Sequence, residues 1–299
     1  MKTQLSEKPG VVLITGSSTG FGRLTAETLA RKGYEVYASM RNLTGKNAAN
    51  AEALQALAKK ENLKLHVVEI DVTNDESAER GASAVIEKAG RIDVLINNAG
   101  VMYWGITEGY TLEQARNQFE PNFFGVIRLN RAVLPQMRRQ QSGLIISISS
   151  LAGGLTFPFF ALYCASKQAL ESLALGYRYD LTAFGIDCVV VEPGPFATNL
   201  LETNDPPRDT DRAAAYGELG SDLQHLIQSL EGGMQDAQLV ADDIAKLIEI
   251  PFGARPFRTI PGSDFGMSPL NTAKDQAQHG LLQALNLEKL EATKISDTV

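Results

Sequence analysis

Six short apolar runs, separated by amphipathic segments, constrain the fold of this chain more than any other feature of its sequence. The runs lie at residues 11–15, 35–40, 65–71, 93–97, 144–149 and 187–191. They are nearly continuous in apolar character and rich in β-branched residues, as in strands that are buried on both faces. Strands of this kind that alternate with helical segments form a parallel sheet covered by helices on each side. The sequence therefore predicts an α/β fold with a doubly wound parallel sheet.

A glycine-rich turn follows the first expected strand and opens a helix. The turn contains Gly16, Ser17, Ser18, Thr19, Gly20, Phe21 and Gly22. Backbone N–H groups and the positive end of a helix dipole converge at such a turn, and glycines let a pyrophosphate approach the main chain closely. A glycine-rich loop alone more often only makes a turn. The flanking strand and helix favour a dinucleotide site of the Rossmann type here.

A tyrosine and a lysine, Tyr163 and Lys167, stand four residues apart, which places them on one face of a helix. A phenol titrates near pH 10, so it exchanges a proton near neutrality only if a neighbouring cation stabilises the phenolate. Lys167 is the expected cation. The pair therefore indicates a proton donor whose pKa the lysine lowers.

Length and composition are consistent with one catalytic domain over residues 1–299. A chain of 299 residues with 44% apolar content can bury most of its apolar surface in a single unit. A polar stretch with two prolines, 204–211, interrupts the pattern, and we interpret residues 199–240 as a variable lid over a substrate, a disordered loop being the alternative. A seventh strand is expected at about 256–260, and a terminal helix at about 272–292 lies within a C-terminal extension, 263–299.

Charge, cysteines and histidines exclude several classes of function. The formal net charge is −7, which argues against non-specific binding to nucleic acid or to an anionic membrane. Cys164 and Cys188 are the only cysteines and are expected to be reduced core residues. The three histidines are scattered and indicate no metal site. The first ten residues are polar, and the apolar run behind them is too short for a signal peptide or a membrane span, so we expect a cytoplasmic protein.

Taken together, the motifs resemble those of the short-chain dehydrogenase/reductase family. They are Thr15-Gly16-x-x-x-Gly20-x-Gly22, Asn97-Asn98-Ala99-Gly100, Ser150, Tyr163-x-x-x-Lys167 and Pro193-Gly194. The resemblance covers about residues 9–262. Within the family the chain looks most like hydroxysteroid-dehydrogenase-like enzymes and bacterial carbonyl reductases. It implies a single-domain Rossmann-type sheet of about seven strands and an oxidoreductase activity.

The resemblance also implies a catalytic tetrad of Asn122, Ser150, Tyr163 and Lys167. Tyr163 is then the acid/base, Lys167 lowers its pKa and binds the nicotinamide ribose, and Ser150 donates to the developing oxyanion. Ser150 at a strand end can equally be a turn or helix cap. Asn122 matches the asparagine whose backbone holds a water in the proton relay. Pro121 precedes it inside a helical stretch, where it removes one hydrogen bond and is expected to cause a kink.

For the cofactor, the resemblance implies that Asp71 and Val72 flank the adenine, Asn98 contacts the adenosine ribose and Thr198 holds the carboxamide. Asp71 can alternatively cap the next helix. The full set of expected cofactor contacts is Gly16, Ser18, Thr19, Gly20, Phe21, Gly22, Arg41, Asp71, Val72, Asn98, Ala99, Gly100, Tyr163, Lys167, Pro193, Gly194, Phe196 and Thr198.

Residues 40 and 41 favour NADP over NAD as the cofactor. NAD-preferring members of the family carry an acidic residue at position 40, where this chain has Met40. Arg41 follows, and its guanidinium can bind a 2′-phosphate bidentately and stack on adenine, unless it is an ordinary solvated arginine.

Aromatic residues near both ends of the expected site favour an apolar ketone or secondary alcohol as the substrate. They are Met102, Tyr103 and Trp104 after the asparagine motif, and Phe157, Phe159 and Phe160 before Tyr163, although such residues are as often ordinary core. The leading hypothesis is an NADP-dependent reductase. The alternatives are a redox-sensing protein that binds NADP without catalysis, and epimerase or dehydratase chemistry on the same fold.

The helix expected over residues 161–184 has apolar residues on more than one face, and a sheet can cover only one of them. A partner helix would cover the rest, so we expect a homodimer or homotetramer. The C-terminal tail is the alternative cover.

Overall fold

A computed structural model describes residues 10–291, apart from the side chain of Glu231. Two expectations fall outside the described residues. They concern the polar N-terminal segment, up to residue 9, and residue 292, where the terminal helix was expected to end. The centre of the fold is one seven-stranded sheet in the order β3-β2-β1-β4-β5-β6-β7, and all of its pairings are parallel. The doubly wound sheet predicted from the sequence is confirmed.

The strands lie close to the ranges predicted from the apolar runs. They are β1 Val11–Ile14, β2 Glu35–Met40, β3 Leu65–Glu69, β4 Val94–Asn97, β5 Gly143–Ile148, β6 Ile186–Val191 and β7 Arg258–Thr259. The four central strands β1, β4, β5 and β6 have side chains that are almost entirely buried, because helices cover both faces of the sheet. The edge strand β7 is shorter than predicted, since it pairs with β6 through only two residues.

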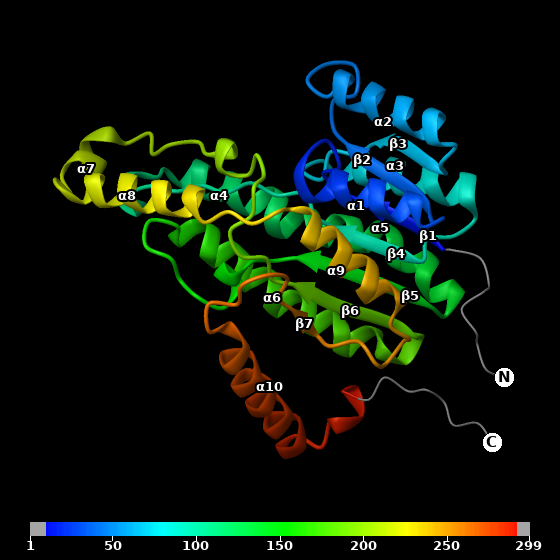
Figure 1. The fold of residues 1–299 in the computed structure, drawn as a ribbon. Coiled ribbons are helices and arrows are strands. Elements are labelled where there is room, and N and C mark those ends of the chain that lie inside the picture. Colours follow the sequence, from blue (N-terminus) through cyan, green and yellow to red (C-terminus); the bar gives the residue numbers. More distant parts are fainter. Residues whose placement is uncertain (1–9, 292–299) are drawn as a thin grey trace.

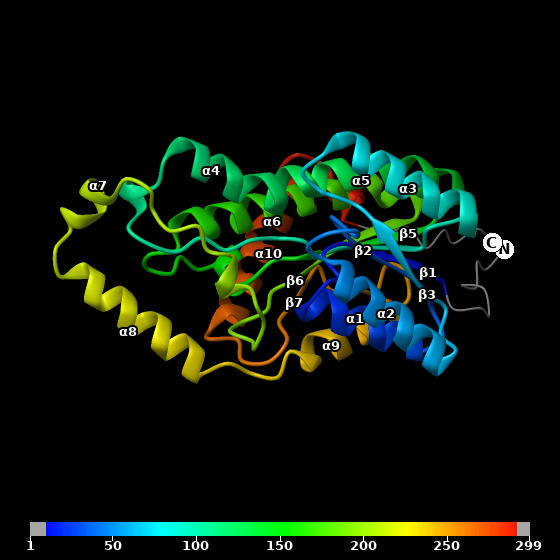
Figure 2. The same ribbon diagram turned by 90° about the horizontal axis from the view of Figure 1, so that it is seen from above.

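Ten α-helices are described, and those that cover the sheet divide between its two faces (Figures 1 and 2). Helices α1, α2 and α9 pack on one face, and α3, α5 and α6 pack on the other. Their bounds are α1 Gly20–Arg31, α2 Ala48–Glu61, α3 Asp75–Ala89, α4 Leu112–Phe119, α5 Gly125–Gln140, α6 Ala161–Leu181, α7 Thr210–Ala214, α8 Leu219–Gly232, α9 Gln238–Glu249 and α10 Met267–Ala284.

The kink expected at Pro121 is a π-helical turn, Glu120–Phe124, between α4 and α5. Proline has no N–H to donate to the carbonyl four residues earlier, so the helix widens locally and accommodates one extra residue. The widened turn places Asn122 in the interior, where it is 1% exposed. The sequence therefore identified this local irregularity and its cause.

The terminal helix α10 starts five residues earlier and ends eight residues earlier than the predicted range 272–292. Pro269 lies in its first turn, where the missing N–H breaks no helical hydrogen bond. The Asp264 carboxylate accepts hydrogen bonds from the backbone N–H groups of Gly266 and Ser268 at this end. Met267 is completely buried. The sequence pattern missed this start because the local Asp264 contacts and the burial of Met267, rather than helical periodicity, mark it.

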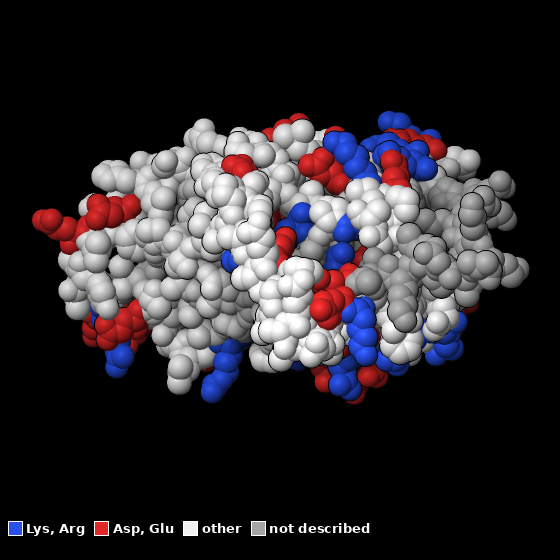
Figure 3. Space-filling view, turned by 90° about the horizontal axis from the view of Figure 1, so that it is seen from below, with Lys and Arg blue, Asp and Glu red and all other residues white. Residues whose placement is uncertain are grey.

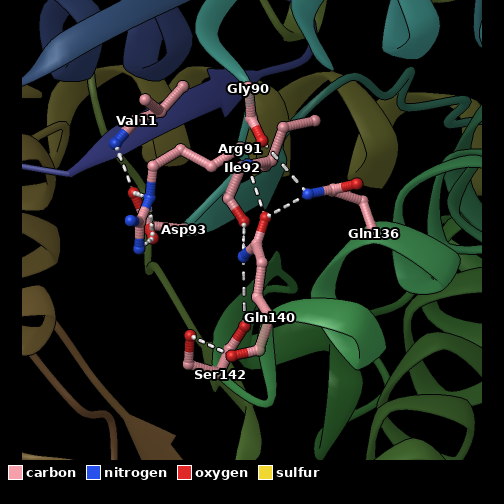
Figure 4. Close-up of polar contacts among 8 residues, drawn as sticks. All are labelled: Val11, Gly90, Arg91, Ile92, Asp93, Gln136, Gln140 and Ser142. Carbon is pink, nitrogen blue, oxygen red and sulfur yellow. Dashed lines mark hydrogen bonds and ion pairs between the residues drawn. The ribbon is translucent and has the colours of Figure 1, made fainter. Parts of the chain in front are cut away.

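At the amino end of the strands, Gln140 joins three segments of the chain (Figure 4). Its side-chain amide donates to the Ile92 carbonyl at 2.9 Å and accepts from the Ile92 N–H at 3.1 Å. It also donates to the Ser142 carbonyl at 3.3 Å. Nearby, Asp93 accepts from the Val11 N–H at 2.7 Å and pairs with Arg91. This network connects β1, β4 and β5 at their amino ends, on the side of the sheet opposite the glycine-rich turn.

We expect Gln140→Ala to lower the free energy of unfolding by about 1 to 3 kcal/mol, because it leaves both backbone groups of the fully buried Ile92 without this partner. Urea denaturation measures the change, and kcat should stay as in the wild type. Arg139→Ala is the control, since Arg139 is exposed and donates a hydrogen bond to another side chain, that of Gln136, rather than to a backbone group. Equal stability of the two variants would contradict the prediction.

Candidate active site

The carboxyl ends of the strands open into a cavity of about 920 Å³. This is where a doubly wound sheet binds its ligands. Most residues predicted to bind cofactor or substrate line it: Gly16, Ser18, Thr19, Gly20, Phe21, Arg41, Asp71, Val72, Asn98, Ala99, Gly100, Ser150, Tyr163, Lys167, Pro193, Gly194, Phe196 and Thr198. Of the predicted residues, Gly22, Trp104, Asn122 and Phe159 do not line it. The structure therefore brings segments that are up to about 180 residues apart in the sequence to one wall.

The glycine-rich turn is held against the end of β4 by Thr15. Its hydroxyl accepts from the backbone N–H groups of Asn98 and Ala99, both at 3.0 Å. Gly16 has a φ of +69°, and a β-carbon there would lie 2.8 Å from the Ala99 α-carbon. Gly22 lies behind the turn, where a side chain would overlap the Asn98 amide. Gly16 and Gly22 therefore allow close packing of the turn, and of these two only Gly16 faces the cavity.

The amino end of α1 points into the cavity without a side-chain cap. Thr19 is the N-cap residue, and its hydroxyl accepts no hydrogen bond from the helix. The first N–H groups of an α-helix have no intrahelical partners. They are therefore donors for an anionic ligand in a place where the helix dipole is positive.

Asn98 and Asp71 both line the cavity, and both also make structural hydrogen bonds. The Asn98 amide donates to the carbonyls of Thr15 at 2.8 Å and Gly16 at 3.1 Å. One Asp71 carboxylate oxygen accepts from the N–H and hydroxyl of Thr73. The interpretation of Asp71 as a helix cap is wrong, because Asn74 caps α3.

Tyr163, Ser150 and Lys167 meet on one wall of the cavity. Tyr163 is 5% exposed and its hydroxyl hydrogen-bonds Ser150. The Lys167 ammonium donates to the Ile148 carbonyl at 2.8 Å and lies 5.7 Å from the centre of the tyrosine ring. Ser150 also caps a short 3₁₀ turn, accepting from the Ala152 N–H at 3.1 Å. The interpretation of Ser150 as a turn cap is therefore confirmed, and its role toward the oxyanion stays a prediction.

The electrostatics of this wall differ from the sequence-based expectation. Burial raises the pKa of Tyr163 to about 12, and the hydrogen bond from Ser150 opposes this rise. Burial lowers the pKa of Lys167 to about 8, against the charge of Glu171, which raises it. The expectation of a lowered pKa for Tyr163 is wrong here, because desolvation of the phenolate dominates and the Lys167 ammonium is directed at a backbone carbonyl.

Asn122 positions the loop after β4 from outside the cavity. Its side-chain amide accepts from the Val101 N–H at 2.9 Å and donates to the Val101 carbonyl at 3.0 Å. It also donates to the Ser166 hydroxyl at 3.0 Å, on the helix that carries Tyr163 and Lys167. The side chain is thus fully engaged, and the main chain of the π-helical turn is the part of Asn122 that remains for a relay.

One end of the cavity is basic. Arg41 is exposed at the end of β2, and within the described residues no carboxylate lies within ion-pair distance of it. Lys46, Asn47 and Asn50 line the same cavity, and the sequence reasoning did not identify them. Lys46 and Asn47 belong to the loop between β2 and α2, and Asn50 lies in the first turn of α2. None of the three belongs to a motif, so only the fold brings them to the site.

The other end of the cavity is apolar and surrounds Tyr163. Phe160 and Cys164 form a buried cluster with it, against which Met102, Trp104, Phe157 and Phe159 pack. Leu226, Ile227 and Leu230 of α8 complete the cluster. Of the six residues expected near the substrate, Met102, Tyr103, Phe157 and Phe160 line the cavity, whereas Trp104 and Phe159 do not. The contribution of α8 was missed because its position over the site depends on the long segment before it.

The remaining expectations concern the cysteines, metal sites, membrane spans and surface charge. Cys164 and Cys188 are both free and buried. Within the described part of the chain, no group of three or more potential metal ligands is found, and no helix has the length and hydropathy to cross a membrane. Figure 3 shows one face of the molecule on which acidic and basic side chains lie beside each other. The cytoplasmic location stays a prediction.

The sheet, the uncapped helix end and the Tyr163 wall together define a dinucleotide-dependent oxidoreductase, and comparison with known proteins gives the family. Residues 10–209 match the short chain dehydrogenase family. The chain therefore belongs to the short-chain dehydrogenase/reductase family, whose members use a nicotinamide cofactor, NAD or NADP, on alcohol or carbonyl substrates.

Relatives of the chain span bacteria and vertebrates. It is 41% identical to human retinol dehydrogenase 8 over 199 residues, which are 66% of this chain and 62% of the relative. It is 33% identical to rat estradiol 17-beta-dehydrogenase 1 over 249 residues, covering 80% of this chain and 68% of the relative. A short-chain dehydrogenase structure from Streptomyces avermitilis has a TM-score of 0.75 and 32% identity, covering 94% of this chain and 98% of that one. The family and the Rossmann-type fold predicted from the sequence are confirmed.

Proposed function

We propose that this protein is an NADP-dependent reductase of apolar ketones or aldehydes, with Tyr163 as the general acid. The observation that carries the proposal is the meeting of Tyr163, Ser150 and Lys167 on the wall where the basic and apolar parts of one cavity join. In support, retinol and estradiol, which name two of the relatives, are alcohols on apolar carbon skeletons.

The cavity fits a phosphorylated dinucleotide. Uncapped N–H groups at the start of α1 and the close approach allowed by Gly16 suit the pyrophosphate, and Arg41 and Lys46 suit a further phosphate. Met40 is 2% exposed and contributes no carboxylate that would repel that phosphate. When bound, the cofactor supplies the hydride. Two N–H donors of Lys167 remain beside the one that Ile148 accepts, and they suit the ribose hydroxyls.

Tyr163 is suited to donate its proton as the substrate carbonyl is reduced. Its raised pKa keeps it protonated at neutral pH, so it begins the reaction as an acid. Ser150 donates a hydrogen bond to the carbonyl oxygen and stabilises the developing negative charge. The positive charge of Lys167, near the ring, then favours the phenolate that remains. Asn122 holds the helix of the tyrosine in place through Ser166, and its backbone is available for a relay water.

In this proposal, residues 199–240 form a lid over the substrate. Its base is fixed by hydrogen bonds such as those between Asn204 and both backbone groups of Trp104. Leu230 and Met234, farther along, line the cavity.

We also propose that residues 1–299 act as one catalytic domain and that the protein is a homodimer or homotetramer. The expected pairing uses helix α6. The alternative cover, the C-terminal extension, reaches this helix at Thr182, whose hydroxyl donates a hydrogen bond to the Leu290 carbonyl.

A panel of apolar ketones and aldehydes with NADPH tests the proposal. Consumption of NADPH with at least one apolar carbonyl compound is the expected result. Binding of NADPH without consumption would instead support the redox-sensing alternative. Conversion of a substrate without net change in the cofactor would support epimerase or dehydratase chemistry.

We expect the rate of ketone reduction to fall as the pH rises through about 8. The ammonium of Lys167 is present below its pKa of about 8 and is lost above it, and the phenolate of Tyr163 then loses its stabilising charge. Initial rates from pH 6 to pH 10 measure this. Lys167→Ala should lower both turnover and NADPH affinity and should abolish the alkaline limb. A wild-type profile that is flat to pH 10 would contradict the assignment.

A further inference from the structure

Two carboxyl groups lie side by side in the protein interior behind the active site. Glu171 stands one helical turn after Lys167 on α6 and is 4% exposed, and Glu192 follows the last residue of β6 and is completely buried. Both carboxyl groups face the same Arg258 Nε, and Glu171 contributes to the raised pKa of Glu192. Two ionised carboxylates placed together in a buried site repel each other, so the arrangement favours a proton on one of the two.

Each carboxyl group has its own further donor. The Ser149 hydroxyl donates to Glu171 at 2.7 Å, and the Asn271 amide of α10 donates to Glu192 at 2.6 Å. The Arg258 side chain lies 3.7 Å from both. One guanidinium thus faces two buried carboxyl groups.

Burial indicates which of the two carboxyl groups is neutral. Burial, and after it the charge of Glu171, raise the pKa of Glu192 to about 8. The other charged groups around the pair are Lys167 on α6, Arg258 on β7, Asp275 of α10, which pairs with Arg258, and Lys274, also of α10. At neutral pH, Glu192 therefore holds its proton.

The partners of this pair are neighbours of active-site residues. Ser149 precedes Ser150, Lys167 is one turn before Glu171, and Glu192 directly precedes the cavity residues Pro193 and Gly194. Any side chain at Gly153 would overlap the Glu171 carboxylate, so the turn after Ser150 rests on it. The pair and α10 thus support three of the segments that form the site.

We propose that Glu171 is a positioning residue of the active site, which holds Ser149 in place and keeps Lys167 protonated, while Glu192, held by Asn271 of the C-terminal helix, retains its proton. The proposal rests on the proposed function, since it assigns Lys167 a charge that turnover requires. It also gives the C-terminal helix α10 a structural role at the site, through the hydrogen bond from Asn271 to Glu192.

Glu171→Gln tests the charge on Lys167. Glutamine can still accept the hydrogen bond from Ser149 and lacks only the charge, so the pKa of Lys167 should fall. We expect the alkaline limb of ketone reduction to move down by about 1 pH unit, because a charge one turn away in a buried site has an effect of this order. Turnover should be about fivefold below wild type at pH 8 and within about twofold of it at pH 6.

Asp275→Asn is the matched control. It removes the same charge from the same cluster, but its carboxylate is more than half exposed and pairs with the far side of Arg258. Its alkaline limb should stay at the wild-type pH. An unmoved limb in Glu171→Gln, or an equal shift in both variants, overturns the role of Glu171.

Thermal unfolding of Glu192→Gln tests the proton on Glu192 without turnover. The pKa of Glu192 is raised in the folded state, so its contribution to stability is present below the unfolded value, about 4.5, and is lost as the pH rises through about 8. The wild type should therefore lose about 5 °C more in Tm between pH 5 and pH 8 than Glu192→Gln does. Equal losses overturn the assignment of that proton. If the wild type reduces no carbonyl compound, the proposed function is refuted. The unfolding experiment needs no turnover, so it still tests whether Glu192 holds its proton in the folded protein.

Discussion

Tyr163→Phe is expected to lower kcat for carbonyl reduction at least about a hundredfold while NADPH affinity changes little. General acid catalysis by a positioned group contributes about a hundred- to ten-thousandfold, and the variant removes only the proton donor. The phenyl ring keeps its place against Phe160 and Cys164, and the glycine-rich turn is untouched. Steady-state rates give kcat, and the fluorescence of bound NADPH gives the affinity.

The matched control for this variant is Tyr177→Phe. Tyr177 is on the same helix, is half-buried and hydrogen-bonds Asn130 through its hydroxyl, but it does not line the cavity. Its kcat should stay within about threefold of wild type. Near-normal turnover in Tyr163→Phe, or an equal loss in both variants, would remove Tyr163 from its proposed role.

The second large effect is expected for the cofactor. Wild type should favour NADPH over NADH by about ten- to a hundredfold in kcat/KM, because one charge-assisted hydrogen bond contributes about 1.5 to 3 kcal/mol. The double variant Met40→Asp with Arg41→Ala should reverse the order. The new carboxylate gains a ribose hydroxyl as partner and repels the 2′-phosphate, so attraction to one cofactor is combined with rejection of the other.

Lys46→Ala extends this test to a residue that the sequence reasoning missed. If Lys46 contacts the same phosphate from the cavity wall, its loss should also lower the preference for NADPH, by about tenfold. Lys88→Ala is the control, since Lys88 lies over the ring of Tyr37 and does not line the cavity. Equal use of the two cofactors by the wild type, or an Arg41→Ala variant with an unchanged ratio, would show that Arg41 is an ordinary solvated arginine.

Local pattern was enough to predict the sheet, the glycine-rich turn and the pair of Tyr163 and Lys167. Apolar runs with β-branched residues specify buried strands directly, and the parallel order then brings the ends of β1, β4, β5 and β6 together. The irregular turn at Pro121 could be predicted for the same reason, since a missing N–H is a property of the residue itself. Each of these conclusions depends on a few neighbouring residues.

Only the tertiary structure decided the charges and the distant contacts at the site. Burial and the position of the Lys167 ammonium set the pKa of Tyr163, and neither can be derived from a spacing of four residues. The approach of α8 to the apolar end and of Asn271 to Glu192 depends on contacts between residues far apart in the sequence. The sequence by itself indicated the motif residues of the candidate site, whereas desolvation and long-range packing, which exist only in the folded chain, decided how those groups are charged, which further residues join them and what holds them.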